Sequence, residues 1–357
     1  MSVEIKSVRI SVGKGYDVSI GKNLLGSCGE LIVKAVKPCR AAIITDSTVE
    51  KLFLVTVAES LRNAGFTVCA FSFPAGEQSK TIETLSAILE FLAENHLTRT
   101  DCVIALGGGV VGDIAGFAAG CYLRGIRYVQ IPTTFLAAVD SSVGGKTGVD
   151  LRVGKNLAGM FIQPEAVVCD TDCLEQLPGE VFSDGAAEAI KTGILSGEQL
   201  FSLFENGDVK SSLTKIIETC VAFKGSIVET DQFENGLRKT LNLGHTIGHA
   251  IEKCSNYTIS HGHAVAVGMA VIARAADRLG LSDPPVAPRI EKALIRNGLT
   301  VHTDFSAEEL TAAALSDKKR AGDEITLVIP GGIGSCYLKT IPVTELNSVI
   351  KAGLEER

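Results

Sequence analysis

The chain has 357 residues and a formal net charge of −7, with 46% apolar and 21% charged residues. This length favours two domains, each large enough for its own core. The acidic balance argues against nucleic acid or an anionic membrane as a partner, although a local basic cluster can still bind a small anion. Glycine is frequent, at 37 residues, and aromatic residues make up only 5%, which favours an α/β protein over a β-sandwich.

Cysteine usage and apolar runs bear on the compartment. The ten cysteines are scattered without a C-x-x-C pair, which predicts reduced thiols and a cytoplasmic protein. Residues 1–10 alternate apolar and charged side chains, so they predict a strand and not a signal peptide. The most membrane-like stretch, residues 103–123, contains Asp113 and several glycines, so no membrane-spanning helix is expected.

The first half of the chain is predicted to alternate strands with helices. The expected strands cover residues 41–46, 66–73, 101–106 and 127–132. One expected helix follows the first strand and ends near residue 62, and a second covers 81–95. Such alternation is typical of a doubly wound, Rossmann-like parallel sheet that binds ligands at the carboxyl ends of its strands.

The second half has a different character. Helical patterns dominate residues 180–281, 286–297 and 307–319, and a short β-like stretch covers 324–330. We therefore predict an α/β domain over residues 1–177 and a mainly helical domain over 178–357. The active site is expected in the cleft between them, where α/β proteins often bind ligands.

Residues 107–112 match G-x-G-x-x-G, directly after a predicted strand and at the start of a predicted helix. Glycines in this context let backbone amides approach a pyrophosphate. The acidic residue usually found about twenty positions later is missing. The segment therefore predicts a phosphate-binding turn that is not a standard dinucleotide fingerprint, and Asp113 after it is a candidate for a ribose or nicotinamide contact.

Residues 141–147 resemble a P-loop, but the first glycine of that motif is replaced by Asp140. A helix-like stretch also precedes the segment where a P-loop needs a strand, so an ATPase is excluded. The remaining interpretation is a glycine-rich loop in which Asp140, Lys146, Lys155 and Asn156 suit a phosphorylated polyol. A solvated basic loop is the alternative.

The segment of residues 245–263 holds four of the six histidines. On a helix, His245 and His249 lie one turn apart on the same face, which suits a divalent cation. His261 and His263 follow in a His-Gly-His sequence. The alternative is a set of surface or partly buried histidines, which the glycines and the second pair disfavour.

Upstream, Glu188 and Lys191 share one face of a predicted helix that is otherwise rich in alanine and glycine. An exposed ion pair is the alternative interpretation. A carboxylate with two histidines is a common catalytic zinc set. Glu188, His245 and one later histidine would supply it.

Several basic residues suit an anionic substrate. Arg238 and Asn242 are one helical turn apart, and the histidines of residues 245 and 249 are expected to extend the same face. This row is too polar for a core and suits a carboxylate or phosphate beside a metal. Lys224, Lys318 and Lys319 are further candidates.

Taken together, these segments resemble the 3-dehydroquinate synthase family, within the sugar-phosphate cyclases. The resemblance spans nearly the whole chain. It is carried by residues 74–80, 107–113, 124–127, 131–134, 139–147, 154–156, 187–191, 236–249, 261–265 and 317–319.

The resemblance implies a metal held by Glu188, His245 and His261, with His249 facing the substrate and His263 not a ligand. Zinc and cobalt both accept this ligand set. The resemblance also implies NAD bound along the α/β domain, at Asp46, Gly76, Glu77, Lys80, Gly108, Gly109, Val110, Gly112, Asp113, Thr133, Thr134, Lys146, Lys155, Cys173 and Gln176.

The implied substrate is a small phosphorylated sugar acid. The residues expected to bind it are Arg124, Asn156, Lys191, Lys224, Arg238, Asn242, Lys318 and Lys319. The groups expected to act in catalysis are His249, Glu234, Lys146 and Asp140. Arg124 resembles the residue that reaches the neighbouring site of a homodimer.

The implied reaction converts 3-deoxy-D-arabino-heptulosonate 7-phosphate into 3-dehydroquinate and phosphate. NAD oxidises the substrate transiently, phosphate leaves by β-elimination, the ketone is reduced again and the ring recloses. The rivals are a metal-dependent polyol dehydrogenase of the glycerol type and another sugar-phosphate cyclase, making an inosose or a valiolone. A non-catalytic nucleotide-binding regulator is a third rival, but it has no need for a metal site.

Overall fold

The computed structural model describes residues 4–316 and 322–354. The chain divides into two compact units, the first formed by residues 1–177 with 217–232 and the second by 178–216 with 233–357. The division after Leu177 coincides with the boundary expected from the sequence. The segment 217–232 differs, because it belongs to the first unit.

The exception is explained by the packing of helix α9 (Leu213–Thr230). A Cβ atom added at Gly225 would lie 2.4 Å from Ile10 Cδ1, so the helix backbone lies against the first strand. The carboxylate of Glu229 accepts a hydrogen bond from the Ser11 amide at 2.5 Å. The sequence of α9 shows an amphipathic helix but not the unit that covers its apolar face.

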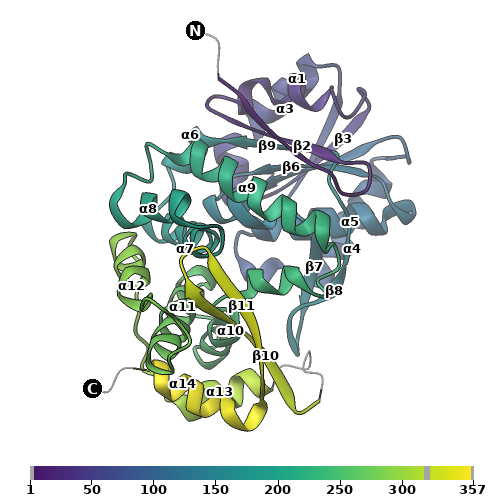
Figure 1. The fold of residues 1–357 in the computed structure, drawn as a ribbon. Coiled ribbons are helices and arrows are strands. Elements are labelled where there is room, and N and C mark those ends of the chain that lie inside the picture. The colour runs from purple at the N-terminus through teal and green to yellow at the C-terminus, as the bar shows by residue number, and fades with distance from the viewer. Residues whose placement is uncertain (1–3, 317–321, 355–357) are drawn as a thin grey trace. The chain divides into compact units, whose positions relative to one another are not determined.

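The first unit is built on a seven-stranded sheet (Figure 1). The β1–β2 pair is antiparallel and the other pairs are parallel. In spatial order the strands are β1 (Lys6–Ile10), β2 (Tyr16–Gly21), β9 (Ala166–Asp170), β6 (Arg127–Pro132), β5 (Cys102–Gly107), β3 (Arg40–Asp46) and β4 (Thr67–Phe73). The predicted Rossmann-like α/β fold is therefore confirmed.

Helices cover both faces of this sheet. Ala42 and Val103 pack into an apolar core with helices α4 and α5, while Ile43 and Ile104, which alternate with them, are also fully buried. Strands buried on both faces are apolar throughout, as β5 is. The helices and single turns of this unit are η1 (Leu25–Ser27), α1 (Cys28–Ile32), α2 (Ser47–Val49), η2 (Glu50–Leu54), α3 (Val55–Asn63), η3 (Glu77–Ser79), α4 (Ile82–Glu94), α5 (Gly109–Cys121), η4 (Tyr122–Arg124), η5 (Ala137–Ser141) and α6 (Thr171–Glu175).

A separate hairpin of β7 (Lys146–Leu151) and β8 (Gly154–Phe161) follows η5. The expectation of one glycine-rich loop was wrong for Lys146, which begins β7, and for Lys155 and Asn156, which lie in β8. Glycines interrupt the alternation of polar and apolar side chains in this hairpin, so its period of two is hard to recognise from the sequence.

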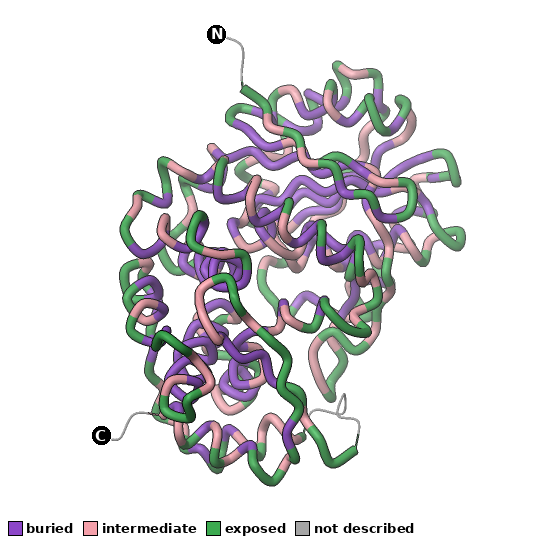
Figure 2. Tube along the Cα trace, viewed as in Figure 1, coloured by how far each residue is buried: buried purple, intermediate pink, exposed green. Residues whose placement is uncertain are grey.

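The second unit is mainly helical and contains one antiparallel hairpin. Its core is α11, most of which is buried (Figure 2). The elements are α7 (Gly179–Ser196), α8 (Glu198–Asn206), η6 (Leu237–Asn242), α10 (His245–Cys254), α11 (His261–Arg278), α12 (Ala287–Arg296), α13 (Ala307–Leu315), β10 (Glu324–Gly332), β11 (Ser335–Pro342), η7 (Val343–Glu345) and α14 (Leu346–Gly353). The expected extension of α13 to residue 319 lies partly outside the described residues.

Helices dominate residues 180–281 as expected, but the expectation of one helix face running from Arg238 to His249 was wrong. The 3₁₀ helix η6 ends at Asn242, and Gly244 has a φ of 78°, a left-handed conformation that interrupts any continuous helix. Arg238 and Asn242 therefore do not extend the helix face of His245 and His249. No helix among the described residues is long and apolar enough to cross a membrane.

Candidate metal and cofactor site

Three side chains from three helices of the second unit meet at one point. Glu188 lies in the middle of α7, and His245 and His261 are the first residues of α10 and α11. The Nε2 atoms of the two histidines lie 3.7 and 3.6 Å from Glu188 Oε1. One potential ligand atom from each residue lies within 4.8 Å of the others, a spacing that can hold a metal ion.

Glycines allow the three helices to approach closely enough for this meeting. A Cβ atom at Gly262 would lie 2.4 Å from the Asp184 backbone, so α11 begins in direct contact with α7. A Cβ atom at Gly268 would lie 2.1 Å from the Gly244 carbonyl oxygen, so α10 and α11 also touch through their backbones. The glycines around the histidines are therefore required by packing, which explains the His-Gly-His sequence.

The Glu188 carboxylate is a buried anion suited to a cation. Its side chain is 1% exposed. Lys191, itself 3% exposed, forms an ion pair with Oε2. Burial favours the neutral acid, but the charge of Lys191 and the neighbouring imidazoles of His245 and His261 outweigh it and hold the pKa of Glu188 well below its usual value. The three residues fit a divalent metal with carboxylate and imidazole ligands.

The two histidines differ electrostatically. Burial and the nearby Lys191 charge hold the pKa of His245 well below its usual value. Burial also disfavours the charged form of His261, but the neighbouring carboxylates of Glu188 and Glu252 raise its pKa to about 10. The Nδ1 atom of His245 lies 3.1 Å from the Leu243 carbonyl oxygen. A carbonyl only accepts, so this nitrogen carries the proton and Nε2 keeps its lone pair toward Glu188.

The remaining histidines take different places. His249 is exposed, and its ring centroid lies 5.4 Å from that of His245 and 6.0 Å from that of His261. His249, Glu252 and His261 form a second group with ligand spacing. His263 lies outside both groups and pairs with Asp184 at 3.0 Å.

The basic segment before α10 is partly buried. Arg238 is 2% exposed, although it was expected on an accessible helix face. Asn242 Nδ2 donates a hydrogen bond to Glu234 Oε1 at 2.6 Å, which pairs a predicted substrate residue with a predicted catalytic one. Lys318 and Lys319 lie outside the described residues.

In the first unit, the phosphate-binding turn has the expected local structure. Gly107 ends β5, and α5 begins at Gly109. A Cβ atom at Gly108 would lie 2.9 Å from Thr134 Cγ2, so a side chain here would fill the turn. The Thr133 hydroxyl is buried without a hydrogen-bond partner among the described residues. The turn has no room for a side chain at Gly108, it lies at a helix N-terminus, and the Thr133 hydroxyl beside it is unsatisfied within the described part of the chain. These features fit the phosphates of a dinucleotide.

A buried lysine lies beside this turn. Lys80 is 5% exposed, and its Nζ atom donates hydrogen bonds to Asp113 Oδ2 and Asn156 Oδ1, both at 2.6 Å. Burial disfavours the charged lysine, but Asp113 and Glu77 outweigh burial and raise the pKa of Lys80. The structure thus brings together residues from the turn 74–80, α5 and the β7–β8 hairpin that the sequence assigned separately to cofactor and substrate.

Two further predicted residues meet where α9 joins the first unit. The Nζ atom of Lys224 contacts both the backbone oxygen and Oδ1 of Asp140 at 2.7 Å. These residues are far apart in sequence and were assigned separately. Their pairing depends on α9 belonging to this unit, which the sequence did not reveal.

The other predicted residues of the first unit are more dispersed. Asp46 ends β3 and caps α2, accepting hydrogen bonds from the amides of Thr48 and Val49. Cys173 is buried and donates to the Asp170 carbonyl at 2.8 Å, and burial raises the pKa of its thiol. Exposed positions are held by Gly76, Glu77, Arg124, Lys146 and Gln176, while Gly109, Val110, Thr134 and Lys155 are partly exposed and Gly112 is buried.

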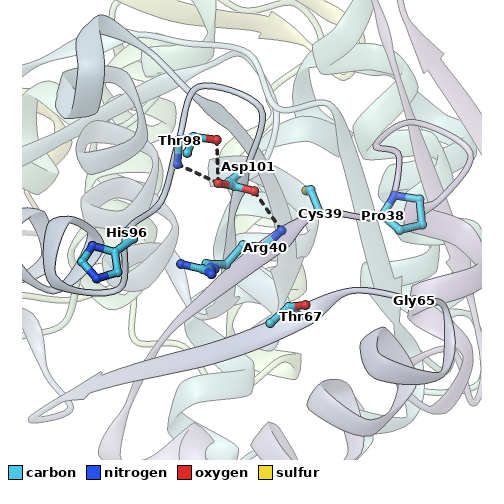
Figure 3. A pocket seen from close by; sticks show the side chains of 8 residues that line it. All are labelled: Pro38, Cys39, Arg40, Gly65, Thr67, His96, Thr98 and Asp101. Carbon is cyan, nitrogen blue, oxygen red and sulfur yellow. Dashed lines mark hydrogen bonds between the residues drawn. The ribbon is translucent and has the colours of Figure 1, made fainter.

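A polar pocket of about 430 Å³ lies at the amino-terminal ends of strands β3, β4 and β5 (Figure 3). It is lined by Pro38, Cys39, Arg40, Gly65, Thr67, His96, Thr98 and Asp101. Asp101 accepts hydrogen bonds from the amides of Arg40 and Thr98 and from the Thr98 hydroxyl. No predicted site residue lines this pocket. Its acidic residue, Asp101, joins β3 to the loop before β5 through these hydrogen bonds.

The chain matches two family models, described as the N-terminal and C-terminal parts of 3-dehydroquinate synthase, over residues 70–184 and 185–320. Curated proteins named 3-dehydroquinate synthase are similar over most of the chain. The one from Streptococcus suis (strain 05ZYH33) is 42% identical and covers 93% of this chain and 95% of its own. The one from Clostridium kluyveri is 40% identical, covering 96% and 97%.

Solved structures show the same fold. A 2-deoxy-scyllo-inosose synthase complexed with carbaglucose-6-phosphate, NAD⁺ and Co²⁺ has a TM-score of 0.87 at 28% identity, covering 98% of this chain and 100% of its own. A 2-epi-5-epi-valiolone synthase from Streptomyces hygroscopicus with NAD⁺ and Zn²⁺ has a TM-score of 0.84 at 26% identity, covering 95% and 96%. A probable glycerol dehydrogenase from Sinorhizobium meliloti shares the fold alone, at 16% identity and a TM-score of 0.64 over 93% of this chain and 94% of its own.

Proposed function

Since the chain belongs to the 3-dehydroquinate synthase family, we propose that it converts 3-deoxy-D-arabino-heptulosonate 7-phosphate into 3-dehydroquinate and inorganic phosphate. It is an enzyme of the phosphate-eliminating cyclase type, like its curated relatives. The structural observation that carries the proposal is the buried group of Glu188, His245 and His261, which offers a metal site to a substrate rich in hydroxyls.

Glu188, His245 and His261 are the proposed metal ligands. A divalent metal bound there supplies Lewis acidity, which lowers the pKa of a coordinated substrate hydroxyl. The support is the buried carboxylate and the two Nε2 atoms that face it. Zinc and cobalt are both proposed, since imidazole and carboxylate ligands accept either.

NAD is the proposed cofactor of the first unit. Bound there, NAD would supply hydride acceptor and donor chemistry without net consumption. The turn of residues 107–112 is proposed to place backbone amides at the pyrophosphate. The Lys80–Asp113 pair offers a donor and an acceptor at fixed positions for a polar part of the cofactor.

Basic residues are proposed to bind the two anionic groups of the substrate. Lys191 and Arg238 are buried cations of the second unit, and Lys224 is the corresponding cation of the first. Ammonium and guanidinium groups form charge-assisted hydrogen bonds with carboxylates and phosphates, so cations at these places suit either anionic group of the substrate. Asn156, Asn242, Lys318 and Lys319 are proposed to add further contacts.

His249 is the proposed principal proton carrier. It is the most accessible of the three clustered histidine side chains and lies beside, not within, the proposed ligand set. An imidazole exchanges protons near neutral pH without a large shift of its pKa. Glu234, Asp140 and Lys146 are proposed as supporting groups, and the contact of Asn242 holds the Glu234 carboxylate in one position.

The proposed function explains features that a glycerol-type dehydrogenase leaves without a role. Such an enzyme has a neutral substrate and gains nothing from the buried cations Lys191 and Arg238. The inosose and valiolone cyclases are closer rivals, but the curated relatives from Streptococcus suis, Enterococcus faecalis and Clostridium kluyveri, at 40–42% identity, are named 3-dehydroquinate synthase. We also propose that the enzyme is a cytoplasmic homodimer in which Arg124 reaches the neighbouring site.

The test is the metal dependence of phosphate release. The enzyme is expected to release phosphate from the heptulosonate phosphate in the presence of NAD, to lose this activity on chelation, and to regain it with zinc or cobalt. Oxidation of glycerol with steady accumulation of NADH, and no phosphate release, would identify a polyol dehydrogenase. Release of phosphate from a hexose phosphate only would identify another cyclase.

A further inference from the structure

The imidazole of His261 lies between two buried carboxylates. Its Nε2 atom is 3.6 Å from Glu188 Oε1, and its Nδ1 atom is 3.4 Å from Glu252 Oε2. The Glu252 side chain is only 3% exposed. Glu188 has a place in the proposed metal site, whereas Glu252 has no role in the proposed function.

The chemistry of the ring connects the two contacts. A neutral imidazole has one N–H donor and one lone pair, and a carboxylate only accepts. In the neutral ring, which is the form that binds a metal, an Nδ1 hydrogen donated to Glu252 leaves the lone pair on Nε2, the nitrogen that faces Glu188. The same arrangement holds at His245, whose Nδ1 atom faces the Leu243 carbonyl and whose Nε2 faces Glu188. Both histidines are therefore set to offer Nε2 at one point.

The position of Glu252 in the fold supports this role. His249 lies four residues after His245, and Glu252 lies three residues after His249, so all three side chains project from one face of α10. Its backbone oxygen accepts hydrogen bonds from the Tyr257 amide at 2.7 Å and the Ser255 hydroxyl at 2.9 Å. The residue is thus held by the turn that leads into α11, where His261 begins the helix.

We propose that Glu252 is a positioning residue for the metal site, fixing the ring orientation and the tautomer of His261. The proposal rests on the proposed metal site. A carboxylate can accept a hydrogen bond from the second ring nitrogen of a histidine that binds a metal. Removing such a carboxylate typically weakens metal affinity about 10–100-fold.

A second metal ion is the competing explanation for Glu252. His249, Glu252 and His261 also have ligand atoms within 4.8 Å of one another. The nitrogen of His261 that faces Glu252 is Nδ1, so ions at both sites would remove the last N–H of the ring. A neutral imidazole resists that loss, which favours a hydrogen bond at this position. The number of ions bound per chain distinguishes the two.

The experiment measures metal binding by the full-length protein after removal of its metal. Affinity for zinc and for cobalt is determined by competition with a chelator, and the absorption spectrum of bound cobalt reports its coordination. The variants are Glu252→Ala, Glu252→Gln and Glu188→Ala. Glu205→Gln is the matched control, because Glu205 is a 7% exposed carboxylate of the same unit that pairs with Arg289.

Glu252→Ala is expected to weaken the binding of one ion about 10–100-fold and to alter the cobalt spectrum. Glu252→Gln keeps an oxygen that accepts the Nδ1 hydrogen, so its loss should be smaller. Glu205→Gln should bind metal as the unaltered protein does. The thermal unfolding of each metal-free variant shows that it is folded.

Two results would overturn the role of Glu252 alone. One is unchanged affinity and spectrum in Glu252→Ala while Glu188→Ala loses metal. The other is binding of two ions by the unaltered protein and one by Glu252→Ala, which would make Glu252 a ligand. Full metal affinity in Glu188→Ala would instead remove the proposed metal site, and the role of Glu252 with it.

Discussion

At the residue scale, buried charges are the most informative features of both units. Lys80 in the first unit and Glu188 in the second are almost completely buried. Each is balanced by a partner of opposite charge, Asp113 and Lys191 respectively. Removing one member of a buried pair leaves the other charge without compensation, which costs more than the pair contributes.

Replacing Lys80 with Met is expected to leave Asp113 uncompensated. We predict a loss of about 3–5 kcal/mol in the free energy of unfolding of the first unit. NAD binding is predicted to weaken at least roughly tenfold, because a charge-assisted contact is worth about 1.5–3 kcal/mol. Urea denaturation and titration with NAD measure the two effects.

The matched control for this prediction is Lys22→Met. Lys22 also pairs with carboxylates, Glu175 and Asp172, but its side chain is 58% exposed. Exposed ion pairs contribute little to stability, so this variant should behave like the unaltered protein. Equal effects of the two substitutions would show that the burial of Lys80 has no importance.

The residues of the proposed metal site were easier to find in the sequence than Glu252, the residue proposed to position one of them. Glu188 stood out because it is an isolated charge in a helix of small residues, and the histidines stood out by their spacing. Glu252 gave no such signal, since the sequence Ile-Glu-Lys resembles an ordinary solvated helix turn. Its burial depends on where α11 begins after the turn at 255–260, and that is a property of tertiary packing.

At the element scale, the site depends on close contact between α7, α10 and α11. Asp184 of α7 accepts hydrogen bonds from the Ser260 hydroxyl at 2.6 Å and from the His263 amide at 3.1 Å. These bonds satisfy part of the N-terminus of α11, whose first amides lack partners within the helix. They also fix the position of the first residue of α11, His261, along the axis of α7 and therefore its position relative to Glu188.

Gly262→Ala is predicted to disturb this contact. The added methyl group would lie 2.4 Å from the Asp184 backbone, so α11 must move away from α7. We expect weaker metal binding, measured by competition with a chelator, and a lower thermal unfolding temperature. Gly179→Ala is the control, because nothing lies within 4 Å of a Cβ atom at Gly179. The prediction fails if both variants bind metal equally well.

Elements with a strong period were predictable and irregular ones were not. The buried strands β3, β4, β5 and β6 were expected within one or two residues, because apolar runs bounded by turns indicate parallel strands. Strands β2 and β9 and the β7–β8 hairpin were missed, because they are short or interrupted by glycine and polar residues. The break at Gly244 was also missed, since helical spacing alone does not reveal a left-handed glycine.

At the scale of the whole molecule, the proposed function assigns NAD to the first unit and the metal to the second. The proposed function therefore draws on residues of both units. The proposed homodimer adds a further requirement, because Arg124 is assigned to the site of the partner. Arg124 is exposed and has a φ of 67°.

Mixing two inactive variants tests the assignment of Arg124. If Arg124 reaches the neighbouring site, a heterodimer of Arg124→Ala and Glu188→Ala has one site with both residues intact. Denaturing and refolding an equal mixture should then restore about a quarter of the normal activity, because half of the dimers are mixed and half of their sites are complete. No restored activity, with dimers present in sedimentation experiments, would place Arg124 in its own subunit's site.

The central claim is that NAD acts as a catalyst that is regenerated in every turnover. Its most direct test is the amount of phosphate released per NAD molecule, measured with the heptulosonate phosphate in large excess over NAD and with absorbance at 340 nm followed in parallel. We predict many phosphates per NAD and no accumulation of NADH beyond the amount of enzyme. Phosphate release that stops at one equivalent of NAD, with matching NADH, would contradict the claim.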